Sequence, residues 1–192
     1  MTKPDKRNYI VQSALELFAK HGFHGAPMTM IAERAGVGVG TIYLYFETKD
    51  VLINELHQEL EEKMYPFLLN GYADNAPIRR RFFNIYTSLL RYFIQFPLDF
   101  RYLEQFYNSP YGVAFRRVKL MGNKTGRSDV FDELFEEGTE WQVFKDLPPV
   151  ILLALAFGPL LTVARDHILG FVHLDDTMID RTINACWDAV RR

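Results

Sequence analysis

Residues 22–50 read GFHGAPMTMIAERAGVGVGTIYLYFETKD, and this stretch decides the fold of the N-terminal part of the chain. Its apolar spacing predicts two short helices, at 28–35 and 39–45, which are separated by Gly36-Val37-Gly38. Glycines between two short helical segments favour an abrupt turn between packed helices. The pattern is typical of a helix-turn-helix, in which the second helix lies in the major groove of DNA and the first crosses the backbone.

Outward from this stretch, apolar spacing predicts helices along the whole chain. An apolar stripe from Ile10 to Phe18 predicts a helix that ends at 20–22, and Thr48 is the predicted N-cap of a long helix that ends near 70–71. The other expected helices cover 76–96, parts of 98–108 and 115–138, 148–169 and 176–191, with a mobile loop at 122–126. The 76–96 helix is apolar on more than one side, which predicts a central position. No alternating strand pattern is present, so we expect an all-α protein of about nine helices.

We expect two domains: a helix-turn-helix DNA-binding domain at 1–48 and a larger ligand-binding and dimerisation domain at 49–192. A chain of 192 residues that is 48% hydrophobic can bury a substantial core. Cys186 is its one cysteine, and no charged-then-apolar signal segment opens the chain, which together favour the cytoplasm. Residues 147–164 are uncharged over a length that could span a membrane, but prolines interrupt them and charges flank them. We therefore expect a buried helix there and no membrane association.

The charge of the chain limits how it could bind DNA. The formal net charge is −2, whereas residues 1–50 carry six Lys or Arg against five Asp or Glu, which gives +1. So weak a basic bias excludes general coating of nucleic acid. Binding at specific sites would depend on a few well-placed contacts and on dimerisation.

About a quarter of the chain resembles the N-terminal domain of TetR/AcrR-type transcriptional regulators. The residues that carry the resemblance, in register, are Ala14-Leu15-Glu16-Leu17-Phe18, Gly22-Phe23, Ile31-Ala32-Glu33-Arg34-Ala35-Gly36-Val37, Gly40-Thr41-Ile42-Tyr43, Tyr45-Phe46 and Lys49-Asp50. The resemblance implies a homodimeric repressor, not an enzyme, whose C-terminal domain binds a small molecule and thereby loosens the hold on double-stranded operator DNA. It also implies DNA contacts at Thr29 and Tyr45 and a phosphate contact at Lys49.

The residues of the second short helix support the same interface. Gly38 and Gly40 would let its first turn approach the DNA backbone, leaving unpaired amides that face phosphate. Val39 and Thr41 are candidates, with Thr29, for contacts with base edges, whereas Tyr43, Tyr45 and Lys49 are assigned chiefly to phosphate. For Tyr43, surface contact and plain packing both remain open. The relatives usually have a polar residue at 38 and 39, so base-specific hydrogen bonding is the feature that this chain changes. Core packing is expected for Ile31, Ala32, Ala35, Val37, Ile42 and Phe46.

The larger domain holds 22 of the 28 aromatic residues, which suggests a pocket for a small apolar or aromatic effector. The alternative is that these rings simply fill a helical core. The predicted lining residues are His57, Tyr86, Phe93, Leu152 and Phe157, followed by Tyr102 and Phe106. Ligand entering beside His57 and Tyr86 would tilt the helix that begins at Lys49. The last two helices of two subunits would form a four-helix bundle that buries Ile151, Leu155, Leu161, Ile183 and Trp187.

Other chemistry has little support in the sequence. Glu55, His57 and Glu59 spread around a helix, so we expect no metal site, and no catalytic or cofactor motif is present. Two rival functions remain open. One is an all-α ligand-binding protein or small enzyme without a DNA-binding role, and the other is a DNA-binding regulator controlled by a protein partner.

Overall fold

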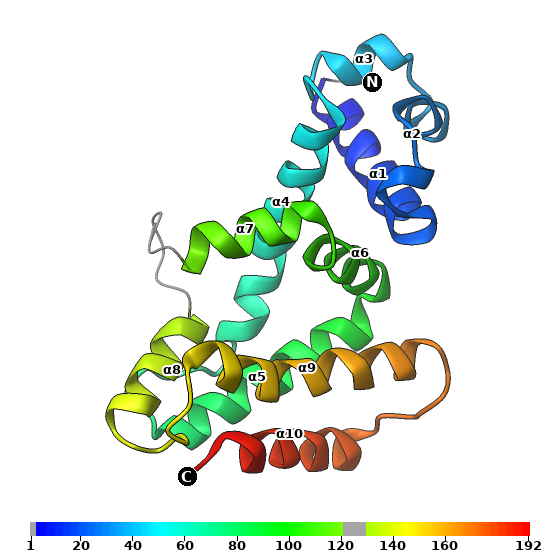
Figure 1. Cartoon of the computed structure of the whole chain (residues 1–192). Coiled ribbons are helices and arrows are strands. Elements are labelled where there is room, and N and C mark those ends of the chain that lie inside the picture. Colours follow the sequence, from blue (N-terminus) through cyan, green and yellow to red (C-terminus); the bar gives the residue numbers. More distant parts are fainter. Residues whose placement is uncertain (1–2, 121–129) are drawn as a thin grey trace. The chain divides into compact units, whose positions relative to one another are not determined.

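The computed structural model describes residues 3–120 and 130–192, which form ten helices and no strand (Figure 1). The prediction of an all-α fold is confirmed. The helices are α1 (Lys3–Gly25), α2 (Met28–Ala35), α3 (Val39–Tyr43), α4 (Lys49–Leu69), α5 (Ile78–Gln95), α6 (Pro97–Tyr107), α7 (Pro110–Leu120), α8 (Val130–Glu140), α9 (Pro149–Ile168) and α10 (Asp176–Val190). The loop predicted at 122–126 lies outside the described residues.

Local signals in the sequence account for most helix ends. The Thr48 hydroxyl accepts a hydrogen bond from the Val51 amide at 3.2 Å, so it caps α4 as predicted. Pro97 occupies the first turn of α6, where its missing N–H costs nothing. α1 extends beyond its expected end, but Gly22 interrupts it with φ 74° and ψ 169°. A non-helical glycine therefore stands where the sequence predicted the helix to stop.

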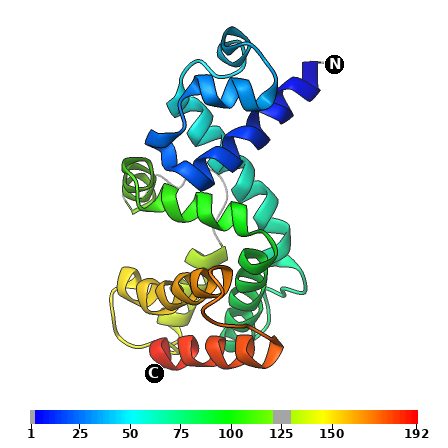
Figure 2. The same ribbon diagram turned by 90° about the vertical axis from the view of Figure 1, so that its right-hand side faces the viewer.

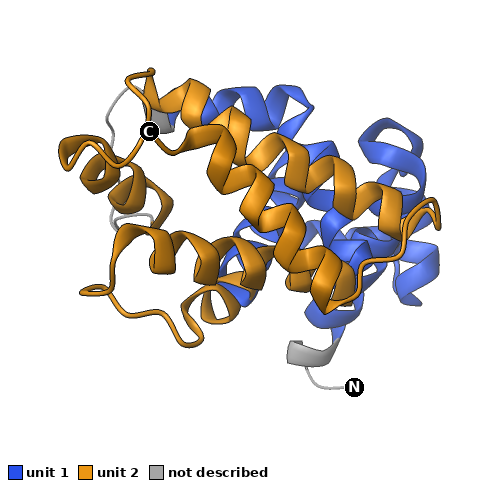
Figure 3. Ribbon diagram, turned by 90° about the horizontal axis from the view of Figure 1, so that it is seen from below, with its two compact units in different colours: residues 1–63, 96–122 blue, residues 64–95, 123–192 orange. Residues whose placement is uncertain are grey.

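The helices divide into two compact units, each with its own core (Figure 3). Unit 1 comprises Met1–Lys63 and Phe96–Gly122, and unit 2 comprises Met64–Gln95 and Asn123–Arg192. The chain therefore passes from one unit to the other inside α4, between α5 and α6, and a third time at 122/123, which lies outside the described residues. The functional division at 48/49 stays a prediction, because compactness reports packing and not the task of each part.

The core of unit 1 is largely aromatic. α1 packs against α6, and the Phe23 ring stands edge-on to Phe18 and Tyr102 at centroid distances of 5.3 and 5.6 Å. Such edge-to-face pairs add to the free energy of burying the rings. The helix-turn-helix is thus built on the same core as α6.

In unit 2, α5 is central, as its two apolar sides predicted. It packs against α8, α9 and α10, and its Phe82 ring stacks on Tyr86 at 4.1 Å and meets Trp187 edge-on at 5.2 Å. α9 and α10 lie side by side (Figure 2). Gly138 on α8 leaves room for the Phe144 ring, since a Cβ atom there would come within 2.2 Å of it.

The prediction that 147–164 forms a buried helix is right about the helix and wrong about the burial. Only one stripe of α9 is buried within the chain, made of Leu152, Ala156, Leu160 and Ala164. By length and composition alone the helix could cross a membrane. Only 22% of its apolar window is buried within the chain. An apolar helix that covers a core or an interface has the same composition, so this is weak evidence for a membrane span.

Candidate nucleic-acid interface

The turn between α2 and α3 depends on one left-handed residue. Gly36 has φ 65° and ψ 33°, and its amide together with that of Val37 reaches back to carbonyls at the end of α2. A Cβ atom at Gly36 would meet nothing within 4 Å, so conformation and not space explains the glycine. This cap turns the chain sharply enough to start α3 three residues later.

The inner face of the helix pair packs as the sequence predicted. Ile31, Ala32, Ile42 and Phe46 are buried, whereas Ala35 and Val37 are half-buried. A salt bridge from Arg34 to Glu16 attaches α2 to α1. Arg7 on α1 bonds Glu55 and Glu59 on α4 at 2.9 and 2.6 Å, which joins the two helices that flank the pair. The two carboxylates neutralise the Arg7 guanidinium, which makes it a poor candidate for a DNA contact.

The predicted DNA-binding residues lie on the outer part of this pair and at the start of α4. Thr29, Gly38, Gly40 and Tyr43 are exposed, and Val39, Thr41, Tyr45 and Lys49 are half-buried. Tyr43 is 51% exposed, so its side chain belongs to the surface and not to the core. Contact between these residues and DNA stays a prediction.

Two glycines in this region have no packing reason within the chain. A Cβ atom at Gly40 would meet nothing within 4 Å, and one at Gly38 would meet only the Thr41 hydroxyl at 4.0 Å. Neither α2 nor α3 has a side-chain cap on its first amides. Bare backbone and uncapped amides are what the close approach of a phosphate group requires.

Lys49 has a partner that the sequence did not reveal. Its ammonium group donates a hydrogen bond to the Phe23 carbonyl oxygen near the end of α1 and lies 5.7 Å from the centre of the Phe18 ring. Partial burial, the largest cause, lowers the pKa of Lys49 from its ordinary value. An ammonium group has three N–H donors, so one bond to the protein leaves donors for a phosphate oxygen.

Sequence reasoning missed Leu44. This side chain is 83% exposed, directly after α3 and between Tyr43 and Tyr45. The signal was present in the spacing, because Ile42 and Phe46 share the buried side and a residue midway between them must point outward. An apolar side chain held outward here suits contact with a thymine methyl or a sugar.

α6 and α7 brace the start of α4. The Tyr111 hydroxyl on α7 donates to the Asp50 carboxylate at 2.5 Å, and the Tyr102 hydroxyl on α6 donates to the Ile53 carbonyl at 2.5 Å. Burial raises the pKa of Tyr102, and the bond to Asp50, followed by burial, raises that of Tyr111 to about 12. Both hydroxyls therefore stay protonated donors. The turn that carries Lys49 is held by helices far along the chain.

The predicted ligand-lining residues divide between the units. His57, Tyr102 and Phe106 belong to unit 1, where they are buried in a packed aromatic cluster. The His57 ring stacks on Phe106 at 3.8 Å and meets Phe115 edge-on at 4.9 Å, and burial lowers its pKa to about 4. His57 is thus a neutral core residue at physiological pH.

The remaining four predicted lining residues lie in unit 2. Tyr86, Phe93 and Leu152 are buried and Phe157 is half-buried. Phe131 joins two of them, with ring distances of 5.9 Å to Tyr86 and 6.5 Å to Phe157. His57 and Tyr86 therefore belong to different units, and lining of a ligand pocket stays a prediction for all seven residues.

The residues predicted for the dimer interface divide into exposed and buried side chains. Ile151 and Leu155 on α9 are 45% and 39% exposed, and Leu161 is half-buried. Ile183 and Trp187 on α10 are buried in the core of their own unit, where Trp187 packs against Phe82. They have almost no surface to offer a partner, so the predicted interface is revised to the exposed side of α9.

Metal and thiol chemistry gain no support from the described ranges 3–120 and 130–192. No group of three or more His, Cys, Asp or Glu side chains there could hold a metal ion. Cys186 is buried, and burial raises the pKa of its thiol to about 11, which keeps it protonated.

The geometry defines a helix-turn-helix protein, and comparison with known proteins agrees. Residues 10–56 match the family model of bacterial regulatory proteins of the tetR family, and residues 77–191 match that of the tetracyclin repressor-like C-terminal domain. The chain belongs to the TetR family of DNA-binding transcriptional regulators. The prediction of a regulator and not an enzyme is confirmed.

Similar proteins align with the full length of the chain or with about a third of it. An HTH-type transcriptional regulator of Haemophilus influenzae is 22% identical over 99% of this chain and 98% of its own. A TetR family protein structure from Vibrio parahaemolyticus is 29% identical, with a TM-score of 0.74 over 97% of this chain and 99% of that one. The fatty acid metabolism regulator of Bacillus subtilis is 39% identical over 34% of this chain and 32% of its own.

Proposed function

We propose that this protein is a homodimeric repressor that leaves its operator when a small apolar or aromatic molecule binds unit 2. The observation that carries the proposal is the outer face of the helix pair: exposed Thr29, Tyr43 and Leu44 beside two glycines without a packing role. Thr29, Val39 and Thr41 would meet base edges, and Tyr43, Tyr45 and Lys49 would bind phosphate. Such a regulator acts in the cytoplasm, where its operator is.

Dimerisation is supported by the exposed apolar side of α9. Val150, Ile151 and Leu155 are all exposed there, although one buried stripe already covers the core. A twofold dimer would bury this side against its copy. It would also set two recognition helices about 34 to 36 Å apart, the spacing of successive major grooves.

Two of the three points where the chain passes between the units, inside α4 and between α5 and α6, support coupling to an effector. A ligand that displaced Tyr86, Phe93 or Phe157 in unit 2 would act on α4 and on the α5–α6 junction, which both continue into unit 1. α4 and α6 then meet at the Tyr102 bond to the Ile53 carbonyl, one turn from Lys49. A 100-fold difference in affinity between two states is about 2.7 kcal/mol, enough to lower operator occupancy substantially.

The relatives do not identify the effector. The Bacillus subtilis regulator of fatty acid metabolism aligns over only 34% of this chain, and the Bacillus halodurans fatty acid degradation regulator shares the fold at 20% identity. The apolar or aromatic class rests instead on the rings of Tyr86, Phe131 and Phe157.

Selection of bound duplexes from a random pool, followed by mobility shift, tests the proposal. We expect a palindromic site bound by one or more dimers. A monomer that binds no duplex would contradict both parts of the proposal. If tightly bound apolar ligands left operator affinity unchanged, the coupling would be wrong, and a protein partner would become the better explanation of control.

A further inference from the structure

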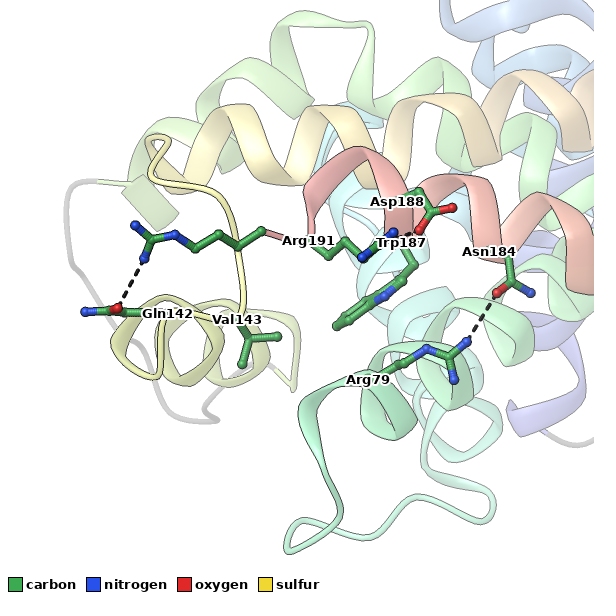
Figure 4. Close-up of a pocket in the computed structure, with 8 residues that line it drawn as sticks. Arg79, Gln142, Val143, Asn184, Trp187, Asp188 and Arg191 are labelled. Carbon is green, nitrogen blue, oxygen red and sulfur yellow. Dashed lines mark hydrogen bonds and ion pairs between the residues drawn. The ribbon is translucent and has the colours of Figure 1, made fainter.

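Unit 2 contains an open cleft of about 510 Å³ on the far side of α10 from α9, between the start of α5 and the turn after α8 (Figure 4). Its walls carry the guanidinium groups of Arg79, Arg191 and Arg192 and one side-chain carboxylate, that of Asp188. A volume of this order suits a small organic ligand. The excess of positive charge favours an anion.

Two of the three guanidinium groups have no carboxylate partner among the described residues. Arg191 is paired with Asp188 at 2.5 Å. Arg79 instead donates to the amide oxygen of Asn184 at 3.3 Å, and Arg192 donates to that of Gln142 at 3.1 Å (Figure 4). These amide oxygens orient the two cations without neutralising them. Each guanidinium has five N–H donors and keeps most of them for a ligand.

The backbone around Arg192 is held and does not fray. The Arg192 amide donates to the Val143 carbonyl at 2.9 Å, and the Lys145 amide donates to the Val190 carbonyl at 2.8 Å. The Lys145 ammonium group also binds the carbonyls of Asp188 and Ala189 at the end of α10. These bonds join the end of α10 to the turn after α8, so the two walls form one structure.

Gln142 itself occupies an unusual position. Its φ of 55° lies in the left-handed region, and it is the only non-glycine residue with positive φ in the described part of the chain. Glycine or asparagine usually takes this place after a helix, because a longer side chain is strained there. The Gln142 side chain accepts a hydrogen bond from Arg192. A glycine at this position could not orient that guanidinium group in the cleft.

The cleft also has a rigid aromatic boundary. Trp187 is only 6% exposed and is fixed by Phe82 and Phe144 at ring distances of 5.2 and 5.8 Å. Arg79 lies over the Phe83 ring at 4.4 Å, which limits its freedom further. Trp187 therefore forms a rigid edge of the cleft and exposes little of its own surface.

We propose that this cleft binds a small organic oxyanion, a carboxylate or a phosphate ester, through Arg79 and Arg192, beside the edge of Trp187. Planar guanidinium groups bind both kinds of oxyanion in a bidentate way. Asn184, Asp188 and Arg191 share one flank of α10, and Thr182, Ala185 and Ala189 share another. No residue of α9 lines the cleft, and neither does Tyr86 or Phe131, so the site is distinct from the aromatic group of Tyr86 and from the exposed side of α9.

Tryptophan fluorescence gives a direct test. The chain has two tryptophans, so a Trp141→Phe variant reports Trp187 alone. We expect the fluorescence of Trp187 to change saturably with phenyl phosphate or benzoate. The ligand that binds more tightly identifies the preferred head group. Arg79→Gln and Arg192→Gln should each weaken binding at least tenfold. Asp188→Asn should tighten it severalfold, because it removes this side-chain carboxylate and releases Arg191.

Arg80→Gln is the matched control, because it removes the same charge from the next residue of α5, which does not line the cleft. Calorimetric titration of the unmodified chain checks that Trp141→Phe has not altered the cleft. Absence of saturation by both methods would overturn the proposal, as would equal weakening by Arg80→Gln and Arg79→Gln. The titrations contain no DNA, so their outcome is separate from that of the repressor proposal.

Discussion

Unit 1 and unit 2 are stabilised by different kinds of contact, and they differ in how much apolar surface they leave exposed. Unit 1 closes on itself: side chains from α6 and α7 reach the backbone or carboxylates of α1 and α4, as Tyr102 does at Ile53, Tyr111 at Asp50 and Gln105 at the Ala19 carbonyl. Unit 2 is tied internally by Arg81, whose buried guanidinium binds Glu137 at 2.5 Å and the Tyr72 hydroxyl at 2.8 Å. Yet unit 2 leaves one apolar side of α9 exposed.

The difference teaches where each unit meets other molecules. These hydrogen bonds fix the helices of unit 1 against one another, which gives the surface proposed for DNA a defined shape. A unit with an uncovered apolar helix needs a partner to bury it. We therefore expect changes in unit 2 to act through assembly and changes in unit 1 to act on DNA contact directly.

The largest effect is expected from charge on α9. Ile151→Glu combined with Leu155→Glu should convert the dimer to a monomer, because two carboxylates cannot be buried at a twofold interface without partners. Operator affinity should then fall about 1000-fold, or about 4 kcal/mol. Sedimentation and mobility shift measure the two quantities. Val113→Glu, at an exposed apolar residue of α7, is the control and should leave the dimer intact.

A pH titration addresses unit 1 alone. An unfolded histidine titrates near 6.5, whereas His57 in the folded chain has a pKa of about 4, so protons bind the unfolded state first as the pH falls. Relative to a His57→Phe variant, the protein should lose about 3 kcal/mol of stability as the pH falls from 6.5 to 4. Above pH 7 the histidine should make no pH-dependent contribution to stability.

Hydrogen exchange can localise that loss. The groups facing His57 are the Tyr107 hydroxyl at 3.4 Å and the Glu61 carboxylate at 3.7 Å. Amides of α4, α6 and α7 should lose protection on acidification, and those of α9 and α10 should change less. A uniform loss that is identical in the His57→Phe variant would contradict the assignment.

A smaller effect is expected at Lys49. Lys49→Gln should weaken operator binding about tenfold for every sequence and lower the salt slope by about 0.9, the value for one phosphate that is no longer neutralised. Arg101→Gln, at an exposed residue of α6, removes the same charge from the same unit and should leave affinity within about twofold, a margin of about 0.4 kcal/mol. Equal effects of both variants would mean that Lys49 contributes only through net charge.

The smallest effect is expected from Tyr111→Phe. The ring keeps its contact with Phe23 at 5.6 Å, but the variant cannot form the hydrogen bond to Asp50, at a cost of about 1 kcal/mol. Operator affinity should fall about threefold while the dimer persists. Tyr9→Phe, at an exposed residue of α1, provides the comparison in the same assay. Unchanged affinity would show that α7 does not position the start of α4.

Local features of the sequence predicted the helix-turn-helix closely. Gly36, the Thr48 cap and the buried side of Ile31, Ile42 and Phe46 are consequences of residue type and of 3.6-residue spacing, which act over one or two turns. The same spacing also implied the exposure of Leu44, although that prediction was not made. The aromatic residues of the larger domain were harder to place, because a ring on an apolar stripe indicates burial but not the neighbour against which it is buried.

By itself, the sequence determined that the chain is helical, several helix ends and the tight turn between α2 and α3, since each depends on interactions within a few residues. Only tertiary structure decided that α6 and α7 join the helix-turn-helix, that His57 and Tyr86 fall in different units, and that Trp187 is buried while Leu155 is not. The physical reason is that periodicity defines an apolar side, whereas long-range packing decides what covers it.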